Sequence, residues 1–152
     1  MPRAVIPSYA RPAARAVLAS LSPDLLKLKK YRDLHAAGGC DPTTGFCTVA
    51  SQALYFLLGG KKAGYAMKVM QHEGGSHWFL TGPDGEVIDV TATQFRTRPD
   101  YAQGRGAWPA VPKPGNAPML ATLKLLDRAR ARLRATTAKP AGYRLRPVPW
   151  PW

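Results

Sequence analysis

The sequence predicts an α+β domain in which a central helix packs on a small antiparallel sheet and both termini are extended and basic. Three observations predict it: an apolar segment of helical length over residues 46–58, short strand-like segments over residues 65–90, and prolines concentrated toward both ends. A chain of 152 residues is long enough for one hydrophobic core. We therefore expect a single domain over 1–152, with its core over about 22–97 and a basic loop, helix and tail over 98–152.

The first 20 residues are basic and contain three prolines, so they lack the uninterrupted apolar stretch of a secretory signal. We expect an unexported N-terminal arm here, and a transit-like segment is the alternative. The first helix is expected from Ser22 as N-cap, with Pro23 at its first position, to the glycine pair at 38–39. One modest core face consists of its apolar positions, Leu25, Leu28 and Tyr31.

Residues 46–58, FCTVASQALYFLL, are apolar on nearly every side of a helix, which indicates a buried central element. This helix is expected to begin with Thr44 as N-cap and to end at the glycine pair 59–60. Such a start places Cys47 in the first turn, where backbone N–H groups have no partner within the helix.

The segments that follow predict three strands, over residues 65–71, 77–81 and 86–90. Between the last two, Pro83-Asp84-Gly85 suits a type I turn followed by a left-handed glycine, which is a three-residue hairpin loop. In that loop Gly82 pairs with Glu86, so paired residue numbers sum to 168 and odd positions of both strands share one face. A two-residue loop would put odd positions of the two strands on opposite faces.

The C-terminal part begins with residues 98–118, which are rich in proline and glycine and lack periodicity, so they predict a wrapping loop. Residues 119–135 predict an amphipathic helix, and residues 146–152, RPVPWPW, predict an extended tail that carries Trp150 and Trp152. The apolar side of the helix is expected to consist of Met119, Leu123, Leu126 and Leu133.

The formal charge of +13 is unevenly distributed. Residues 1–46 carry seven Lys or Arg against three Asp or Glu, residues 47–100 carry five against five, and residues 101–152 carry ten against one. A neutral module with basic flanks results, and such flanks suit nucleic acid or an acidic protein as partner. No run of about 18 apolar residues exists, so we expect no membrane partner. Two cysteines are too few for a disulfide scaffold, which favours the reducing cytoplasm.

The chemistry-bearing residues are Cys47, His77 and Asp89. A cysteine is nucleophilic as the thiolate, and an unperturbed thiol of pKa about 8.5 is only slightly ionised at neutral pH. A helix start and a neighbouring histidine both favour the thiolate, and Cys47 has the first while His77 can supply the second. The loop parity makes His77 and Asp89 diagonal neighbours on one face, roughly 7–8 Å apart at the backbone. Asp89 would fix the imidazole tautomer, and the other ring nitrogen would face Cys47.

The segments GFCTVASQALYFLLGG and SHWFLTGPDGEVIDVTATQF resemble the core of papain-like and transglutaminase-like cysteine hydrolases, and most closely the small bacterial YunG-type proteins. The shared pattern is a cysteine that opens a helix, a histidine that opens a strand and an aspartate that ends the next strand. The resemblance covers about residues 45–95. It implies a minimal papain/transglutaminase-like core with Cys47, His77 and Asp89 as catalytic triad.

The oxyanion donor has two candidates, because YunG-type proteins often have Gln where this chain has Phe46. One is the backbone N–H of Cys47 and the other is the side chain of Gln94. Trp78 and His72 are further candidates for the cleft beside the thiol.

We expect acyl chemistry that needs no metal and no cofactor. The first choice is hydrolysis of an amide, peptide or isopeptide bond in a peptide or protein through a thioester, as in a cysteine peptidase or amidase, with transglutaminase-like acyl transfer as sibling. The alternative is a non-enzymatic basic binding protein on a degenerate cysteine-hydrolase fold, encoded by a phage or mobile element, that contacts nucleic acid or a host protein. The thiol itself has two rival roles, a Cys40–Cys47 disulfide or a zinc site that adds His72 and His77.

Overall fold

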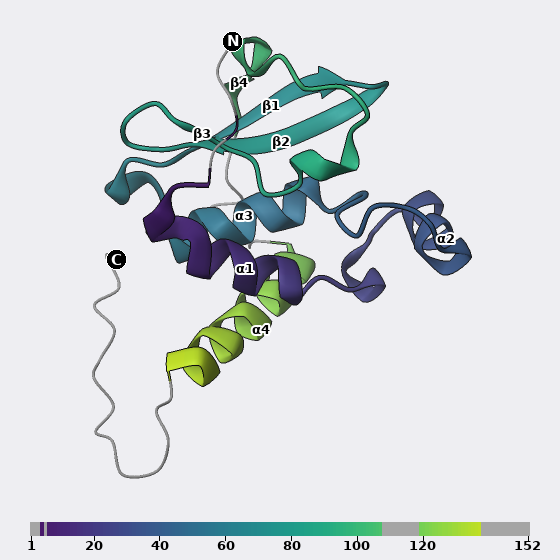
Figure 1. The fold of residues 1–152 in the computed structure, drawn as a ribbon, viewed down its shortest axis with the longest axis horizontal. Coiled ribbons are helices and arrows are strands. Elements are labelled where there is room, and N and C mark those ends of the chain that lie inside the picture. Colours follow the sequence, from purple (N-terminus) through teal and green to yellow (C-terminus); the bar gives the residue numbers. More distant parts are fainter. Residues whose placement is uncertain (1–3, 5, 108–118, 138–152) are drawn as a thin grey trace.

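The computed structural model describes residues 4, 6–107 and 119–137, and it confirms the α+β class. The described part contains four α-helices and one antiparallel sheet with the strand order β3-β2-β1-β4 (Figure 1). The helices are α1 (Arg11–Ala19), α2 (Lys29–Ala37), α3 (Cys47–Leu57) and α4 (Leu120–Thr137). The strands are β1 (Ala66–His72), β2 (Gly75–Thr81), β3 (Val87–Ile88) and β4 (Arg105–Gly106).

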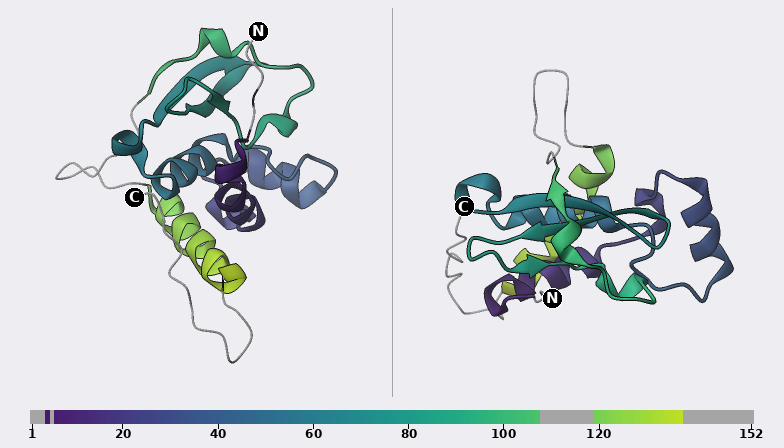
Figure 2. Two further views of the ribbon diagram at one scale, coloured as in Figure 1. Left: turned by 60° about the vertical axis from the view of Figure 1, so that its left-hand side comes forward. Right: turned by 90° about the horizontal axis from the view of Figure 1, so that it is seen from above.

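Helix α3 is the central element, because the sheet lies on one side of it and α1 and α4 lie on the other (Figure 1). It packs on β2, α1 and α4, and the turned views show the same order of layers (Figure 2). From Val49 to Leu57, every residue of α3 except Phe56 is buried. Contacts on both sides therefore explain why this helix is apolar nearly all round.

The hairpin of β2 and β3 has the predicted register. Leu80 pairs with Ile88 and Thr81 with Val87, so that each pair of residue numbers sums to 168 as expected. The loop closes with the N–H of Gly82 bonded to the carbonyl of Glu86 at 2.9 Å. Gly85 has a φ of 77°, the left-handed conformation that the three-residue loop requires.

The two faces of the sheet have separate apolar clusters. The face toward α3 includes Met67, Leu80, Ile88 and Val90, which belong to the main core. The other face carries Met70, Phe79, Val87 and Tyr101. Because Met70 pairs directly with His77, the His77 side chain lies on this second face, under the segment that follows β3.

The expectation of an N-terminal arm is wrong for residues 11–19, which form α1. Its buried residues are Ala13, Ala14, Ala16 and Val17, and they belong to the main core. Pro12 does not prevent this helix, because it stands within the first two positions, where its missing N–H costs no hydrogen bond.

The first expected helix is split into a 3₁₀ helix, η2 (Pro23–Leu25), and α2. Between them the chain is extended, and this lets the neighbouring side chains of Leu25 and Leu26 both enter the core. The guanidinium of Arg32 donates to the carbonyl of Leu26 at 2.7 Å and so holds the break. Leu28 was expected in the core but is 52% exposed, and α2 has no buried residue.

Ser22 is the N-cap residue of η2 and Pro23 is its first residue, as predicted, although the Ser22 side chain makes no capping hydrogen bond. The N-cap predicted for α3 is wrong. Phe46, rather than Thr44, is the N-cap residue of α3, because the N–H groups of Thr44 and Phe46 are used in turns within the preceding loop. Cys47 nevertheless lies in the first turn of α3, as predicted.

Helix α4 confirms the predicted C-terminal helix, but its buried side differs from the expectation. Met119 and Leu123 are exposed, whereas the buried residues are Thr122, Leu125, Leu126, Ala129 and Leu133. Thr122 is buried because its hydroxyl donates to Oε1 of Gln52 in α3 at 2.7 Å, which satisfies both polar groups. Within the described residues, no helix combines the length and the apolar character needed to cross a bilayer.

The wrapping loop predicted over 98–118 is structured in its first part. Residues 101–103 form the 3₁₀ helix η5 (Tyr101–Gln103), and β4 adds a short strand to the edge of β1. Residues 108–118 and the tail with Trp150 and Trp152 lie outside the described residues.

If α1 is a core element, two adjacent residues in it should respond differently to truncation. Val17 is fully buried, and Val17→Ala should lower the free energy of unfolding by about 2 kcal/mol through lost burial and the cavity left behind. Leu18 is 38% exposed, and Leu18→Ala should cost less than about 1 kcal/mol. Urea denaturation of both variants measures the difference, and equal small losses would mean that α1 is not part of the core.

Candidate active site

Cys47 is half-buried and is the first residue of α3. The first hydrogen bond within this helix joins the N–H of Ala50 to the carbonyl of Phe46, at 2.9 Å. The N–H groups before Ala50 therefore have no partner inside the helix, and they place positive potential near the sulfur. Gly45 fixes the approach to the helix, with a φ of 82° and no room for a Cβ beside the ring of Tyr31.

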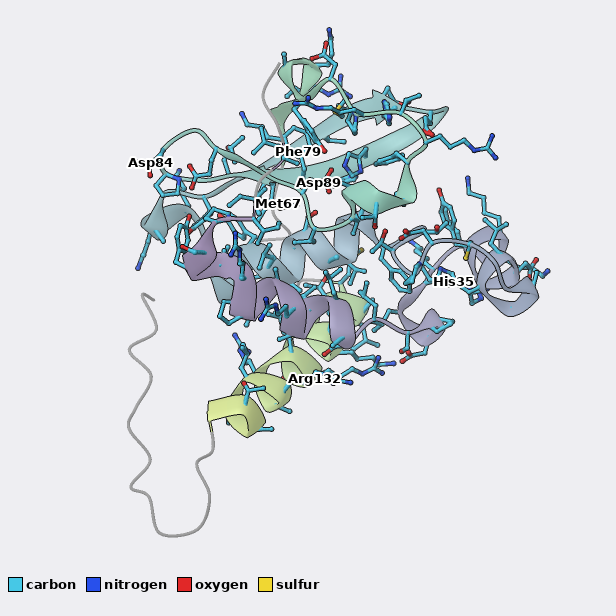
Figure 3. All side chains as sticks on the ribbon, in the orientation of Figure 1. His35, Met67, Phe79, Asp84, Asp89 and Arg132 are labelled. Carbon is cyan, nitrogen blue, oxygen red and sulfur yellow. The ribbon has the colours of Figure 1, made fainter. Side chains whose placement is uncertain are left out.

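His77 and Asp89 form a buried pair. His77 lies in β2 and Asp89 directly follows β3, and their exposed fractions are 1% and 5%. Nε2 of His77 and Oδ2 of Asp89 are 2.6 Å apart. Asp89 lies on the sheet side of α3 (Figure 3). The hairpin register produces this contact, because it places both residues on one face of the sheet.

The carboxylate of Asp89 is held by further donors. The hydroxyl of Tyr101 donates to Oδ2 at 2.8 Å, while the N–H and the hydroxyl of Thr91 donate to Oδ1 at 3.1 and 3.3 Å. Burial and the charge of Asp89 raise the pKa of Tyr101, so its hydroxyl remains a donor. Sequence reasoning missed Tyr101, because it lies in a segment without periodicity.

Two phenylalanines enclose the imidazole of His77. The ring of Phe95 meets it edge-on with centroids 4.5 Å apart, and Phe79 lies nearly parallel at 6.2 Å. Phe79 in turn packs on Tyr101. Phe95 was also missed as a site residue, and its edge-on contact helps to bury the imidazole.

The thiol of Cys47 lies beside the start of β2. Its sulfur is 3.8 Å from the carbonyl oxygen of Ser76, the residue before His77. Nδ1 of His77 is buried, and no hydrogen bond of ordinary geometry reaches it from the part of the chain that the structure describes. Because Nε2 is bonded to Asp89, Nδ1 is the ring nitrogen that has no partner among the described residues.

The pKa of His77 is raised from 6.5 to about 9. Burial alone would lower this pKa, but the hydrogen bond and the charge of Asp89, with a smaller effect of the neighbouring Cys47, outweigh it. His77 is therefore mainly imidazolium at neutral pH. Because the folded protein favours protonation, this contribution to the free energy of unfolding is complete below pH 6.5 and is lost as the pH rises through about 9.

A cleft of about 640 Å³ opens in front of Cys47. It lies between the start of α3, the turn that joins β1 to β2, and the segment from η2 to the first residues of α2. The three cleft candidates from the sequence, Gln94, Trp78 and His72, all line it together with Cys47. His77 and Asp89 are not among its lining residues, and they lie behind the thiol.

Gln94 is the last residue of the 3₁₀ helix η4 (Ala92–Gln94), and only the oxygen of its side-chain amide has a partner among the described residues. Its Oε1 accepts from the N–H of Gly45 at 3.3 Å, while its Nε2 is buried and unpartnered among the described residues. The two loops concerned are also joined by Asp41, whose Oδ1 accepts from the hydroxyl of Thr93 at 3.2 Å. Gln94 thus lines the cleft that contains Cys47 and has an N–H donor that is unused among the described residues.

His72 lines the cleft, but its Nε2 is already engaged by a backbone carbonyl. Its Nε2 is 2.9 Å from the carbonyl of Thr97, and its ring packs edge-on against Phe95. These contacts fix the segment that covers His77. Trp78 is half-buried and forms part of the cleft wall, since its neighbours in β2 point to the other face.

The rival roles of the thiol find no support in the geometry. Cys40 and Cys47 are both free thiols. Cys47 therefore forms no disulfide with Cys40. Among the described residues, no three or more His, Cys, Asp or Glu side chains lie close enough together to bind a metal ion.

Comparison with known proteins finds no match: no family model, no curated protein and no solved structure matches this chain.

The raised pKa of His77 gives a direct test of the pair. In the wild-type protein, NMR titration of the imidazole should give a pKa of about 9. Asp89→Asn removes the main opposing charge, so burial should prevail and the pKa should fall below 6.5. Tyr101→Phe is the matched control, because it removes one hydrogen-bond partner of Asp89 but keeps the carboxylate. In this variant the pKa of His77 should stay above 6.5. A wild-type pKa at or below 6.5 would show that the ion pair does not form.

Proposed function

We propose that this protein is a cysteine enzyme that cleaves an amide or isopeptide bond of a peptide or protein through a thioester. One observation carries the proposal. A buried imidazole is held by Asp89 through Nε2, at 2.6 Å, and its other nitrogen remains for the thiol of Cys47 at the start of α3. This is the order of groups that an activated thiol nucleophile needs, with the thiol open to a cleft and the base behind it.

In the first half-reaction, the thiolate of Cys47 attacks the carbonyl carbon of the substrate, and the carbonyl oxygen becomes an oxyanion. The imidazolium of His77 then gives its proton to the nitrogen of the leaving amine as the C–N bond breaks. A pKa of about 9 suits this step, because His77 already carries the proton at neutral pH. The amine leaves and the acyl group remains on Cys47 as a thioester.

In the second half-reaction, neutral His77 takes a proton from water, and the resulting hydroxide oxygen attacks the thioester. The C–S bond breaks, the carboxylic acid leaves, and the thiolate and imidazolium are restored. An amine in place of water would give acyl transfer, which is the sibling outcome. Asp89 keeps its negative charge throughout and stabilises the imidazolium form.

Two donors suit the oxyanion. The backbone N–H of Cys47 is at the start of α3 and has no partner in the helix, and Nε2 of Gln94 is buried and unused among the described residues. A fixed donor that has no partner in the free protein gains one when the oxyanion forms, so it stabilises the transition state more than the ground state.

The proposal includes kinship with the papain and transglutaminase-like hydrolases. It is supported by the order of a cysteine at a helix start, a histidine in a strand and an aspartate after the next strand. Both cysteines are free thiols, which suits a reducing compartment, so we propose the cytoplasm as its location.

Thiol labelling tests the proposal without a known substrate. In a Cys40→Ser background, iodoacetamide should alkylate Cys47 at pH 6 at least about tenfold faster than an ordinary exposed thiol, because the imidazolium favours the thiolate. His77→Ala should lose this advantage, and Asp89→Asn should lose much of it. Circular dichroism of each variant separates loss of reactivity from loss of fold.

Two results would count against the enzyme. A Cys47 that reacts at the ordinary rate in wild type and in folded His77→Ala would exclude an activated thiol. Tight, steeply salt-dependent binding of nucleic acid that survives Cys47→Ala would favour the non-enzymatic basic protein instead.

The role of Gln94 can be separated from thiolate formation. Acylation of Cys47 by p-nitrophenyl acetate passes through an oxyanion, whereas alkylation by iodoacetamide does not. Gln94→Met removes the amide donor without adding charge, so it should slow acylation by about 10²-fold and alkylation by less than about threefold. Gln103→Met, at an exposed glutamine in η5, is the matched control and should change neither rate. Equal slowing of both reactions would assign Gln94 a structural role only.

A further inference from the structure

One wall of the cleft carries two lysines that have no carboxylate partner among the described residues. Lys27 and Lys30 both line the cleft and are exposed, while the nearby Lys29 is paired with Asp33. The nitrogen of Lys30 lies over the ring of Tyr31, 4.8 Å from its centroid, which keeps it on the cleft side of α2. This wall therefore offers two positive charges to whatever occupies the cleft.

Exposed apolar side chains line the cleft beside these two lysines. Leu28 stands between the two lysines in the chain and is 52% exposed, and Met119, which also lines the cleft, is 38% exposed. The half-buried ring of Trp78 adds further apolar surface. Large apolar side chains exposed beside a candidate nucleophile are suited to cover an apolar group of a ligand.

The acidic group on the opposite wall is already in use. Both carboxylate oxygens of Glu73 accept from the backbone N–H of Arg96, at 3.0 and 3.1 Å, and one lies 3.7 Å from Nε2 of His72. Glu73 is therefore hydrogen-bonded within its own wall and forms an ion pair with neither Lys27 nor Lys30 among the described residues. The net charge of +13 adds a long-range attraction for anions.

We infer that the cleft binds an acyl donor whose apolar residue contacts Leu28, Trp78 and Met119 and whose adjacent acidic residue faces Lys27 and Lys30. This inference rests on the proposed function, since it assigns the substrate class of the same cysteine site. The apolar and the acidic residue are adjacent because Leu28 and the two lysines share one short segment. A volume of about 640 Å³ is in the range that holds a few such groups.

Peptidyl chloromethyl ketones test this preference at Cys47 itself. The sulfur forms a bond to the methylene carbon and chloride leaves, so the rate of inactivation reports how well the peptide binds. In the Cys40→Ser background, acetyl-Asp-Leu-chloromethyl ketone should react about fivefold faster than acetyl-Lys-Leu-chloromethyl ketone, a difference typical of exposed charges that reduced salt enlarges. Acetyl-Asp-Gly-chloromethyl ketone, which lacks the apolar side chain, should react more slowly than the Leu compound.

A charge-reversal pair provides the matched control. Lys27→Glu/Lys30→Glu should reverse the order of the Asp and Lys compounds. Lys61→Glu/Lys62→Glu changes the net charge of the protein equally at exposed sites that do not line the cleft, so the Asp compound should still react faster. Reversal in both double variants would mean that net charge alone sets the preference, and it would overturn the inference.

The outcomes also separate this inference from the proposed function. Equal rates for the Asp and Lys compounds, with iodoacetamide labelling still fast and dependent on His77, would overturn the substrate class and leave the cysteine chemistry intact. Slow iodoacetamide labelling that does not depend on His77 would overturn the cysteine chemistry, and the substrate class with it.

Discussion

The site depends on a carboxylate that is removed from water. Burying the charge of Asp89 is costly unless donors replace its hydration, and here four donors do so: the His77 ring, the Tyr101 hydroxyl, and the N–H and hydroxyl of Thr91. These donors come from β2, from η5 and from the turn that follows β3. The buried charge therefore fixes the hairpin and its covering segment relative to one another, and it fixes the imidazole with them.

The thiol belongs to a different part of the fold, and its distance from the imidazole depends on how two loops meet. The loop before α3 and the loop after Asp89 are joined by Gly45 to Gln94 and by Asp41 to Thr93. These contacts place the start of α3 beside the start of β2. They also leave one amide donor of Gln94 without a partner among the described residues, so the loops that bring the thiol to the sheet also hold the group that we propose for the oxyanion.

Local signals in the sequence were sufficient for the features that local chemistry decides. The turn residues set the loop length and hence the shared face of His77 and Asp89, and the apolar pattern identified α3 as central. Features decided by distant contacts could not be predicted. Tyr101 becomes a site residue only because the fold brings Asp89 within hydrogen-bond distance of its hydroxyl. The chain between η2 and α2 is extended because this lets two adjacent leucines reach the core. Helix α1 is stabilised by the packing of its buried alanines rather than by helix propensity alone.

The three-residue loop between β2 and β3 has a consequence for how this chain can change over evolutionary time. Substitutions at its exposed positions, Pro83 and Asp84, leave the register untouched, whereas gain or loss of one residue moves every side chain of one strand to the opposite face. Such a change would leave composition and most of the core intact while separating the imidazole from its carboxylate. Related proteins that keep the chemistry should therefore vary in sequence at Pro83 and Asp84 but keep a loop of the same length.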